Sequence, residues 1–207
     1  MTSGYRIREG TGGGQEKAVI DISAIDFDAL AGRFQQSDRK NVELEQLKAA
    51  IRAMLERLVD RNPTRADYLA TFEELIESYN AGSRNIEEMF HDLLALSREL
   101  SEEQQRHVRE QLTEEELTIF DLLTRPGPDL TTEERSEVKK VARALLEKVR
   151  AAVVLDWRRK AQARARVRLA IEDTLDEGLP RAHTPELYRT KVSAVFEHVY
   201  EKFPGVA

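Results

Sequence analysis

The chain has 207 residues, enough for one domain or two small ones with a real hydrophobic core. Charged residues make up 34% of it and aromatic residues 6%, a balance typical of a helical, heavily solvated protein rather than a β-rich one. The absence of cysteine excludes disulfide bonds and thiolate metal sites. No apolar run approaches the roughly 20 residues of a membrane span, and the N-terminus lacks the apolar core of a signal peptide. We therefore expect a soluble, cytoplasmic protein without a membrane partner.

The first half of the chain consists of a tail followed by amphipathic helices. Residues 1–17 are Gly-rich and aperiodic, which predicts a flexible tail, and a short extended piece is expected at 18–22. Asn62-Pro63 ends one helix, while Thr64 and Gly82 are expected to cap the start and the end of the next. Apolar periodicity predicts four helices in this half, at residues 26–36, 42–59, 65–80 and 86–99.

Three later segments match the capping box, in which a Ser or Thr side chain and a Glu or Gln three residues later satisfy each other's backbone donors. They are Ser101–Gln104, Thr113–Glu116 and Thr131–Glu134, and each predicts the start of a helix. Thr184-Pro185 predicts the start of the last helix, because proline suits the first helical turn.

Pro126-Gly127-Pro128 is the clearest internal hinge in the sequence. It separates two expected subdomains, a helical one at residues 18–125 and a C-terminal one with long helices at residues 130–203. Together with the helix starts, this organisation predicts an all-α fold, an irregular multi-helix bundle of about eight helices.

The stretch from Glu137 to Glu177 contains no Gly or Pro and pairs an apolar stripe with dense arginine. Apolar residues at helical spacing predict a helix at about 132–152, and the β-branched Val153-Val154 breaks their stripe. Asp156 is a good N-cap residue, so a second helix is predicted at about 156–177. The apolar stripe of the first helix comprises Val138, Val141, Leu145, Val149 and Ala152.

Charge is unevenly placed along the chain, whose net charge is −6. Residues 101–137 hold 11 acidic and 4 basic side chains, whereas residues 139–168 hold 11 basic and 2 acidic ones. Two interpretations remain open. The two segments pack together within the chain, or the basic one forms a face for a protein partner or for DNA phosphates.

The second predicted helix contains the candidate site. On a helical projection Trp157, Arg164 and Arg168 share the apolar side, where arginine needs carboxylate partners within the domain or on a docked protein. The alternatives are a solvated helix with the ion pairs Asp156–Lys160 and Arg168–Glu172, and direct DNA contact. The candidate interface residues are Trp157, Arg158, Arg159, Lys160, Arg164 and Arg168.

Short patterns that suggest catalysis lack the required context. Pro128-Asp129 with Glu137-x-Lys139 has the spacing of a nuclease motif, but here the second part opens a helix rather than lying on a strand. Glu88-x-x-His91 is half of a di-iron motif and has no second copy. We therefore expect no catalytic residue, no cofactor, no metal and no small-molecule ligand in this chain.

Four stretches carry a family resemblance. Val154–Leu175 (VLDWRRKAQARARVRLAIEDTL) resembles the C-terminal helical region of the R subunit of type I restriction-modification enzymes. Leu112–Thr124, Phe196–Phe203 and Ile25–Phe34 are similar to other parts of that region, so the likeness spans roughly residues 18–203. The part around Leu155-Asp156-Trp157-Arg158 is the most specific.

The resemblance implies a role within a larger machine. The R subunit is an ATP-driven DNA translocase with a nuclease domain, and its C-terminal helices are implied to join the motor to the methyltransferase core of M and S subunits. None of the family's enzymatic motifs has a counterpart here, so ATP and Mg²⁺ are implied only for the parent subunit. The expectation is a non-catalytic docking module, with M and possibly S as partners. The alternative is a DNA-binding module that grips duplex through the basic 139–168 surface.

Overall fold

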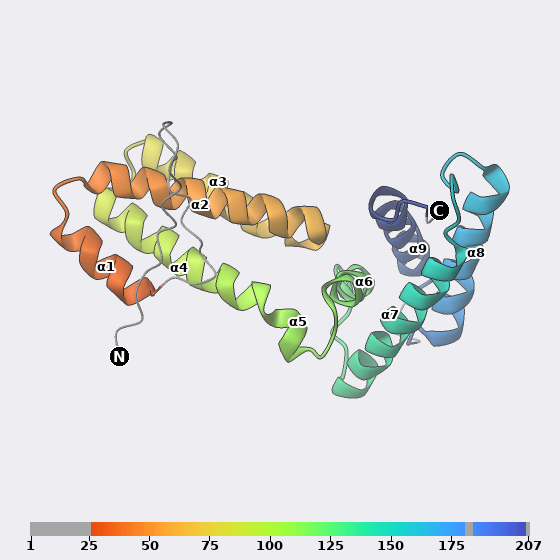
Figure 1. Ribbon diagram of the computed structural model, residues 1–207. Coiled ribbons are helices and arrows are strands. Elements are labelled where there is room, and N and C mark those ends of the chain that lie inside the picture. The colour runs from red at the N-terminus through yellow and green to blue at the C-terminus, as the bar shows by residue number, and fades with distance from the viewer. Residues whose placement is uncertain (1–25, 181–183, 206–207) are drawn as a thin grey trace, which may run out of the picture. The chain divides into compact units, whose positions relative to one another are not determined.

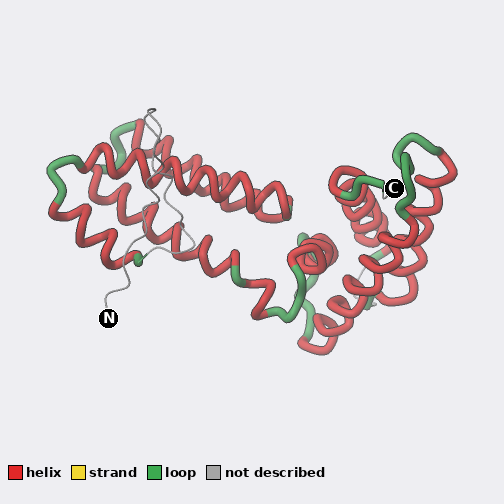
Figure 2. Tube along the Cα trace, in the orientation of Figure 1, coloured by secondary structure: helices red, strands yellow, loops and turns green. Residues whose placement is uncertain are grey.

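The computed structural model describes residues 26–180 and 184–205. Within these ranges the chain forms nine α-helices and one short 3₁₀ helix, with no strand (Figures 1 and 2). The predicted all-α class is therefore confirmed. The expected tail at 1–17 and the extended piece at 18–22 lie outside the described residues.

The helices group into two compact units. Residues 26–57 and 67–102 form the first, and residues 58–66 and 103–205 form the second. The sequence placed the boundary at the Pro126-Gly127-Pro128 loop, which differs from this division. The reason is that the helix before this loop packs against two later helices, so it belongs to the C-terminal unit.

The first unit contains α1 (Phe27–Gln36), α3 (Ala66–Asn80) and most of α2 (Lys40–Arg61) and α4 (Ile86–Gln104). Its core includes a stacked pair of rings, Phe34 on α1 and Phe90 on α4, with centroids 3.6 Å apart. Gly82 ends the turn after α3 with φ of 73°, as expected of a helix-stopping glycine.

Two caps differ from the prediction. Asn62, not Thr64, caps the chain after α2, and its side chain accepts hydrogen bonds from both the backbone and the hydroxyl of Thr64. Ser101 lies inside α4, because the apolar stripe of that helix continues to buried Leu100 and the backbone has no reason to restart. A capping-box pattern therefore acts as a cap only where the preceding helix has ended.

The second unit contains α5 (Arg106–Arg109), α6 (Glu114–Thr124), α7 (Thr132–Ala152), α8 (Ala161–Gly178) and α9 (Pro185–Lys202). Thr113 and Thr131 form complete capping boxes, and Thr184 caps α9, as predicted. Helix α7 packs against α6 and α8, and α9 contacts the same two helices (Figure 1). Its core includes Leu117, Phe120, Val138, Leu145, Val149, Trp157, Val167, Ile171, Val195 and Val199.

The connection between α7 and α8 corrects a second helix boundary. The sequence predicts a helix from Asp156, but α8 begins only at Ala161, and residues 153–160 form a turn. Asp156 does not cap a helix. It adopts φ of 57°, the left-handed conformation that Asp tolerates better than most residues. Lys160 occupies the N-cap position of α8, but its side chain makes no capping hydrogen bond.

A network of buried charges joins three segments of the second unit. Arg65 is almost completely buried and donates to Glu103 at 2.8 Å and to Glu114 at 3.3 Å. Arg106 donates to the other oxygen of Glu103 and to both oxygens of buried Asp121. Burial alone would lower the pKa of Arg106, but its hydrogen bonds to these two carboxylates raise it above the usual value. The network therefore ties the 58–66 segment to α5 and α6.

The Pro126-Gly127-Pro128 loop is anchored rather than hinged. Lys191 on α9 is 1% exposed, and its Nζ donates to the carbonyl of Pro126 at 2.8 Å. Burial lowers the pKa of Lys191 to about 8, and the group to which its Nζ donates is an uncharged carbonyl. A buried side chain of the C-terminal unit thus holds the backbone of this loop in place.

A pair of substitutions tests the caps. Thr131→Ala should lower the free energy of unfolding by about 1 kcal/mol, because the backbone N–H of Glu134 loses the hydroxyl that accepts its hydrogen bond. Ser101→Ala, at a position with the same sequence pattern but inside α4, should change it by less than about 0.5 kcal/mol. Urea unfolding followed by circular dichroism measures both. Equal losses would contradict the assignment of caps.

Lys191→Met tests the buried ammonium group. It should raise the free energy of unfolding at pH 7 by about 1 kcal/mol, because a buried charge without a carboxylate is replaced by an apolar chain. The gain should shrink between pH 8 and 10.5, where folded wild type has released the proton that its unfolded chain still binds. Lys140→Met, at an exposed position of α7, controls for the loss of a lysine. If the free energies of unfolding of Lys191→Met and wild type differed by the same amount at every pH, the burial of a charge at Lys191 would be contradicted.

Candidate functional site

The candidate site is built around the turn at residues 153–160. Trp157 is 0% exposed, and its Nε1 donates to the carbonyl of Phe203 at 2.9 Å. Figure 1 shows the segment after α9 beside this turn. The sequence places Trp157 on the helix as a possible partner anchor. In the structure it is a core residue that fixes the turn to the end of α9.

Aromatic rings of α9 surround the tryptophan. The indole meets Phe196 and Tyr200 edge to face, with centroids 6.3 and 5.7 Å apart. Arg158 lies over the ring of Tyr200 and Arg168 over that of Phe196, each at 5.7 Å from the centroid. Two of the predicted interface arginines are therefore held in place by stacking, which orders a side chain without neutralising its charge.

The arginines near the turn bind backbone carbonyls. Arg164 donates to the carbonyl of Arg158 at 2.7 Å, and Arg158 donates to that of Glu201 at 3.0 Å. Within the described residues Arg164 therefore has a carbonyl partner supplied by the turn, where the sequence predicted a carboxylate of the domain or of a docked protein. Lys160 donates to the carbonyl of Leu155 and not to Asp156.

One predicted ion pair on α8 is present. Arg168 donates to Glu172 at 2.9 Å, one helical turn later. Arg159 and Arg166 are exposed, and among the described residues no carboxylate pairs with either of them. The helix therefore combines one internal pair with several cations that face solvent.

The basic segment divides into two parts with different partners. On α7, Lys139 pairs with Glu110 at 2.7 Å and Arg150 pairs with Glu115, so the acidic and basic segments do pack together there. The hydrogen bond from Lys139 is the main cause that lowers the pKa of Glu110. In the part from Arg158 to Arg164, by contrast, the arginine and lysine side chains donate to carbonyls. This second part therefore retains uncompensated charge.

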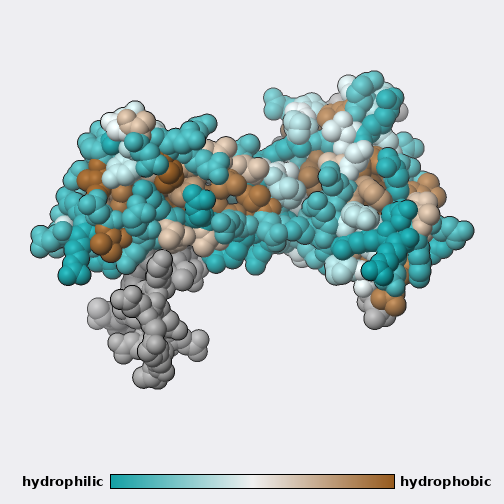
Figure 3. Space-filling model, turned by 90° about the horizontal axis from the view of Figure 1, so that it is seen from above, coloured by the Kyte–Doolittle hydropathy of each residue, from teal (hydrophilic) through white to brown (hydrophobic). Residues whose placement is uncertain are grey.

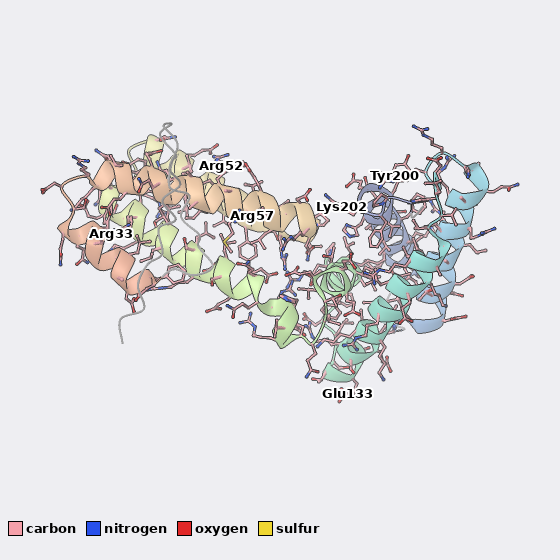
Figure 4. The ribbon with its side chains drawn as sticks, viewed as in Figure 1. Arg33, Arg52, Arg57, Glu133, Tyr200 and Lys202 are labelled. Carbon is pink, nitrogen blue, oxygen red and sulfur yellow. The ribbon has the colours of Figure 1, made fainter. Side chains whose placement is uncertain are left out.

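Apolar side chains are exposed beside these cations. Leu155 is 54% exposed, Tyr200 41% and Val154 39%. Figure 3 shows strongly hydrophilic side chains interspersed with apolar ones over the C-terminal unit, and Figure 4 places Tyr200 near the end of α9. The sequence analysis missed these three residues. The break in the apolar stripe at Val154-Leu155 was the available signal, since it puts large apolar residues where no helix face buries them.

The turn is also closed by a tight backbone contact. A Cβ added to Gly205 would lie 2.3 Å from the carbonyl oxygen of Val154, so only glycine fits there. Gly205, Trp157 and Phe203 therefore hold the backbone on both sides of Leu155. The exposed side chains project from a fixed turn rather than from a loose loop.

A concave region lies elsewhere in the same unit. It has a volume of about 310 Å³ and is bounded by α6, α9 and the end of α2. Its charged groups are paired, Lys202 with Asp60 and Glu115 with Arg150. Burial, and then the neighbouring Lys202, lower the pKa of His198 and favour its neutral form. The lining comprises Asp60, Arg61, Glu114, Glu115, Thr118, His198, Lys202 and Phe203.

The residues of the nuclease-like pattern have structural roles. Lys139, its lysine, is committed to Glu110, and Glu137 is exposed on α7. In the described part of the chain no three His, Cys, Asp or Glu side chains come together as a possible metal site. Within the same residues no helix is long and apolar enough to cross a membrane.

Comparison with known families identifies the chain. The family model described as type I restriction enzyme HindI endonuclease subunit-like, C-terminal, matches residues 13–203. The chain belongs to this family. The resemblance found in the sequence is therefore confirmed, and the site described above lies in the C-terminal region of a type I restriction endonuclease subunit. No curated protein and no solved structure matches the chain.

Trp157→Phe tests the structural role of the tryptophan in this restriction-subunit region. It should lower the free energy of unfolding by about 2 kcal/mol, because the carbonyl of Phe203 loses its donor and a void remains in the core. Tyr200→Phe keeps the stacked ring and should cost less than about 0.5 kcal/mol. Urea unfolding followed by circular dichroism compares them. Wild-type stability of the Trp157 variant would show that the indole does not hold the turn.

Proposed function

We propose that this region is a non-catalytic docking module that holds the parent motor and nuclease subunit on the methyltransferase core of M and S subunits. The carrying observation is the surface at residues 154–160, where exposed Leu155 lies among cations that bind carbonyls rather than carboxylates. Membership of the family supports a place within a type I restriction complex. By this proposal ATP and Mg²⁺ act elsewhere in the parent subunit.

The rest of the second unit supports a scaffold rather than an active site. Buried Arg65, Glu103 and Asp121 are paired in one network with Arg106, and buried Lys191 donates to the carbonyl of Pro126. Exposed cations of this unit lie around the turn at residues 153–160. The stacking of Arg158 on Tyr200 and the buried indole of Trp157 hold this turn in place. A rigid surface with arginine and tyrosine side chains is a favourable docking site, because little side-chain freedom is lost on binding.

A DNA grip is the second candidate. Exposed Arg159, Lys160 and Arg166 support it, because phosphates bind clustered cations regardless of sequence. The ion pairs of Lys139 and Arg150 count against it, since they neutralise part of the basic 139–168 surface within the chain. The remaining cations point in several directions around α8 and do not form one track.

Size-exclusion chromatography with light scattering distinguishes the two. The purified chain is mixed in turn with its cognate M/S core and with a labelled duplex of about 30 base pairs at about 0.15 M salt. We expect co-elution with the core and not with the duplex. Co-elution with the duplex alone would overturn the docking role in favour of the DNA grip.

An activity assay provides an independent test. The purified chain with ATP, Mg²⁺ and DNA should show neither ATP hydrolysis nor cleavage, because the proposal assigns both reactions to other parts of the subunit. The assembled complex is the positive control. Turnover by the isolated chain, retained after a further purification step, would contradict a docking module.

A further inference from the structure

We infer that Leu155, Arg158, Arg159, Lys160 and Tyr200 form the docking surface itself, and that it receives an acidic protein segment with an apolar side chain at its centre. This inference rests on the proposed function and makes it specific. It names the surface of this chain and the chemistry of the partner segment. The five residues are called the turn surface below.

The apolar part of the turn surface is exposed beside a buried tryptophan. Leu155 is more than half exposed, although Trp157, two residues later, is completely buried. Val154 and Tyr200 are also large apolar or aromatic side chains with substantial exposure. Trp157 is therefore buried, whereas Val154 and Leu155 of the turn and Tyr200 of α9 remain exposed. Burial of these three side chains on association would stabilise a complex.

The turn surface is also preorganised. Trp157 bonds Phe203, and Gly205 approaches Val154 so closely that a side chain would not fit. Arg158 is fixed by Tyr200 on one side and by the carbonyl of Glu201 on the other. Binding would immobilise few further groups, which favours affinity and specificity.

The charge of the turn surface identifies the partner as acidic. Between residues 153 and 171 the sequence contains one carboxylate, Asp156, against six cations. Arg158, Lys160 and Arg164 donate to carbonyls, which satisfy donors but leave the positive charges uncompensated. Carboxylates of a partner would supply that compensation and would form charge-assisted bonds.

The occupant is a protein rather than DNA because of what surrounds these cations. A phosphate backbone offers exposed Leu155 no apolar contact. A protein segment can place an apolar side chain on Leu155 and Tyr200 and carboxylates on the cations around them. The exposed apolar residues thus decide between the two classes of partner.

A pair of double variants tests the turn surface. Leu155→Ser with Arg159→Glu removes the apolar contact and reverses one charge. Leu169→Ser with Arg166→Glu makes the same changes on the outer face of α8, where Leu169 is 55% exposed. Thermal unfolding of both variants first establishes that each is folded. Titration into the cognate M/S core then measures affinity, with the labelled duplex as the second ligand.

The turn-surface variant should bind the core at least about tenfold more weakly than wild type, and the α8 control within about threefold of it. Equal binding by both variants would overturn the inference but leave the docking role intact. Equal loss in both would show a diffuse electrostatic contact and also overturn it. Failure of the wild type to bind the core would instead refute the proposed function. Loss of duplex binding alone in the turn-surface variant would make the surface a DNA site.

Carbodiimide crosslinking gives a second readout. This reagent joins an amine to a carboxylate in direct contact, so the complex should yield a crosslink from Lys160 to an Asp or Glu of the core, identified by mass spectrometry. Lys160→Arg keeps the charge, removes the amine and should abolish this crosslink. Crosslinks that arise only from lysines of α7, such as Lys140, would place the contact elsewhere and overturn the inference.

Discussion

The burial of Trp157 is the constraint on which the surface around it depends. An indole in the core, bonded to Phe203, can be reached from the end of α7 only through a turn in which Asp156 adopts a left-handed conformation. That conformation costs about 1 kcal/mol, whereas the loss of a buried tryptophan costs about 3 kcal/mol or more. The tryptophan therefore dictates the turn, and the turn exposes Leu155.

The second unit uses its charges in two distinct ways. Arg65 and Arg106 are buried with carboxylates, and truncation of one member would leave the others charged and unpaired in a dry environment. The arginines of the turn have carbonyl and aromatic partners, so they are ordered but not neutralised. Similar residue types thus give a structural network in one place and a cationic surface in another.

Membership of the restriction-enzyme family and the geometry of the turn agree in one respect. The stretch that most suggested the family in the sequence, Leu155 to Arg158, lies in the turn that Trp157 fixes to the carbonyl of Phe203. A specific sequence at this position has a structural reason, since Trp157 must be buried and its neighbours must then lie at the surface. The same arrangement gives the proposed docking role a defined location.

The sequence by itself determined the all-α class, most helix bounds and the caps at Thr113, Thr131 and Thr184, because helical periodicity and capping are local. It also revealed the family. It did not determine the start of α8, the grouping of α6 with α7 and α9, or the partners of Arg158 and Arg164. Trp157 fits a helix start in the local pattern, but the space that buries it comes from Phe196, Tyr200 and Phe203, about 40 residues later. Only tertiary packing could therefore decide which side of the turn faces the core and which is exposed.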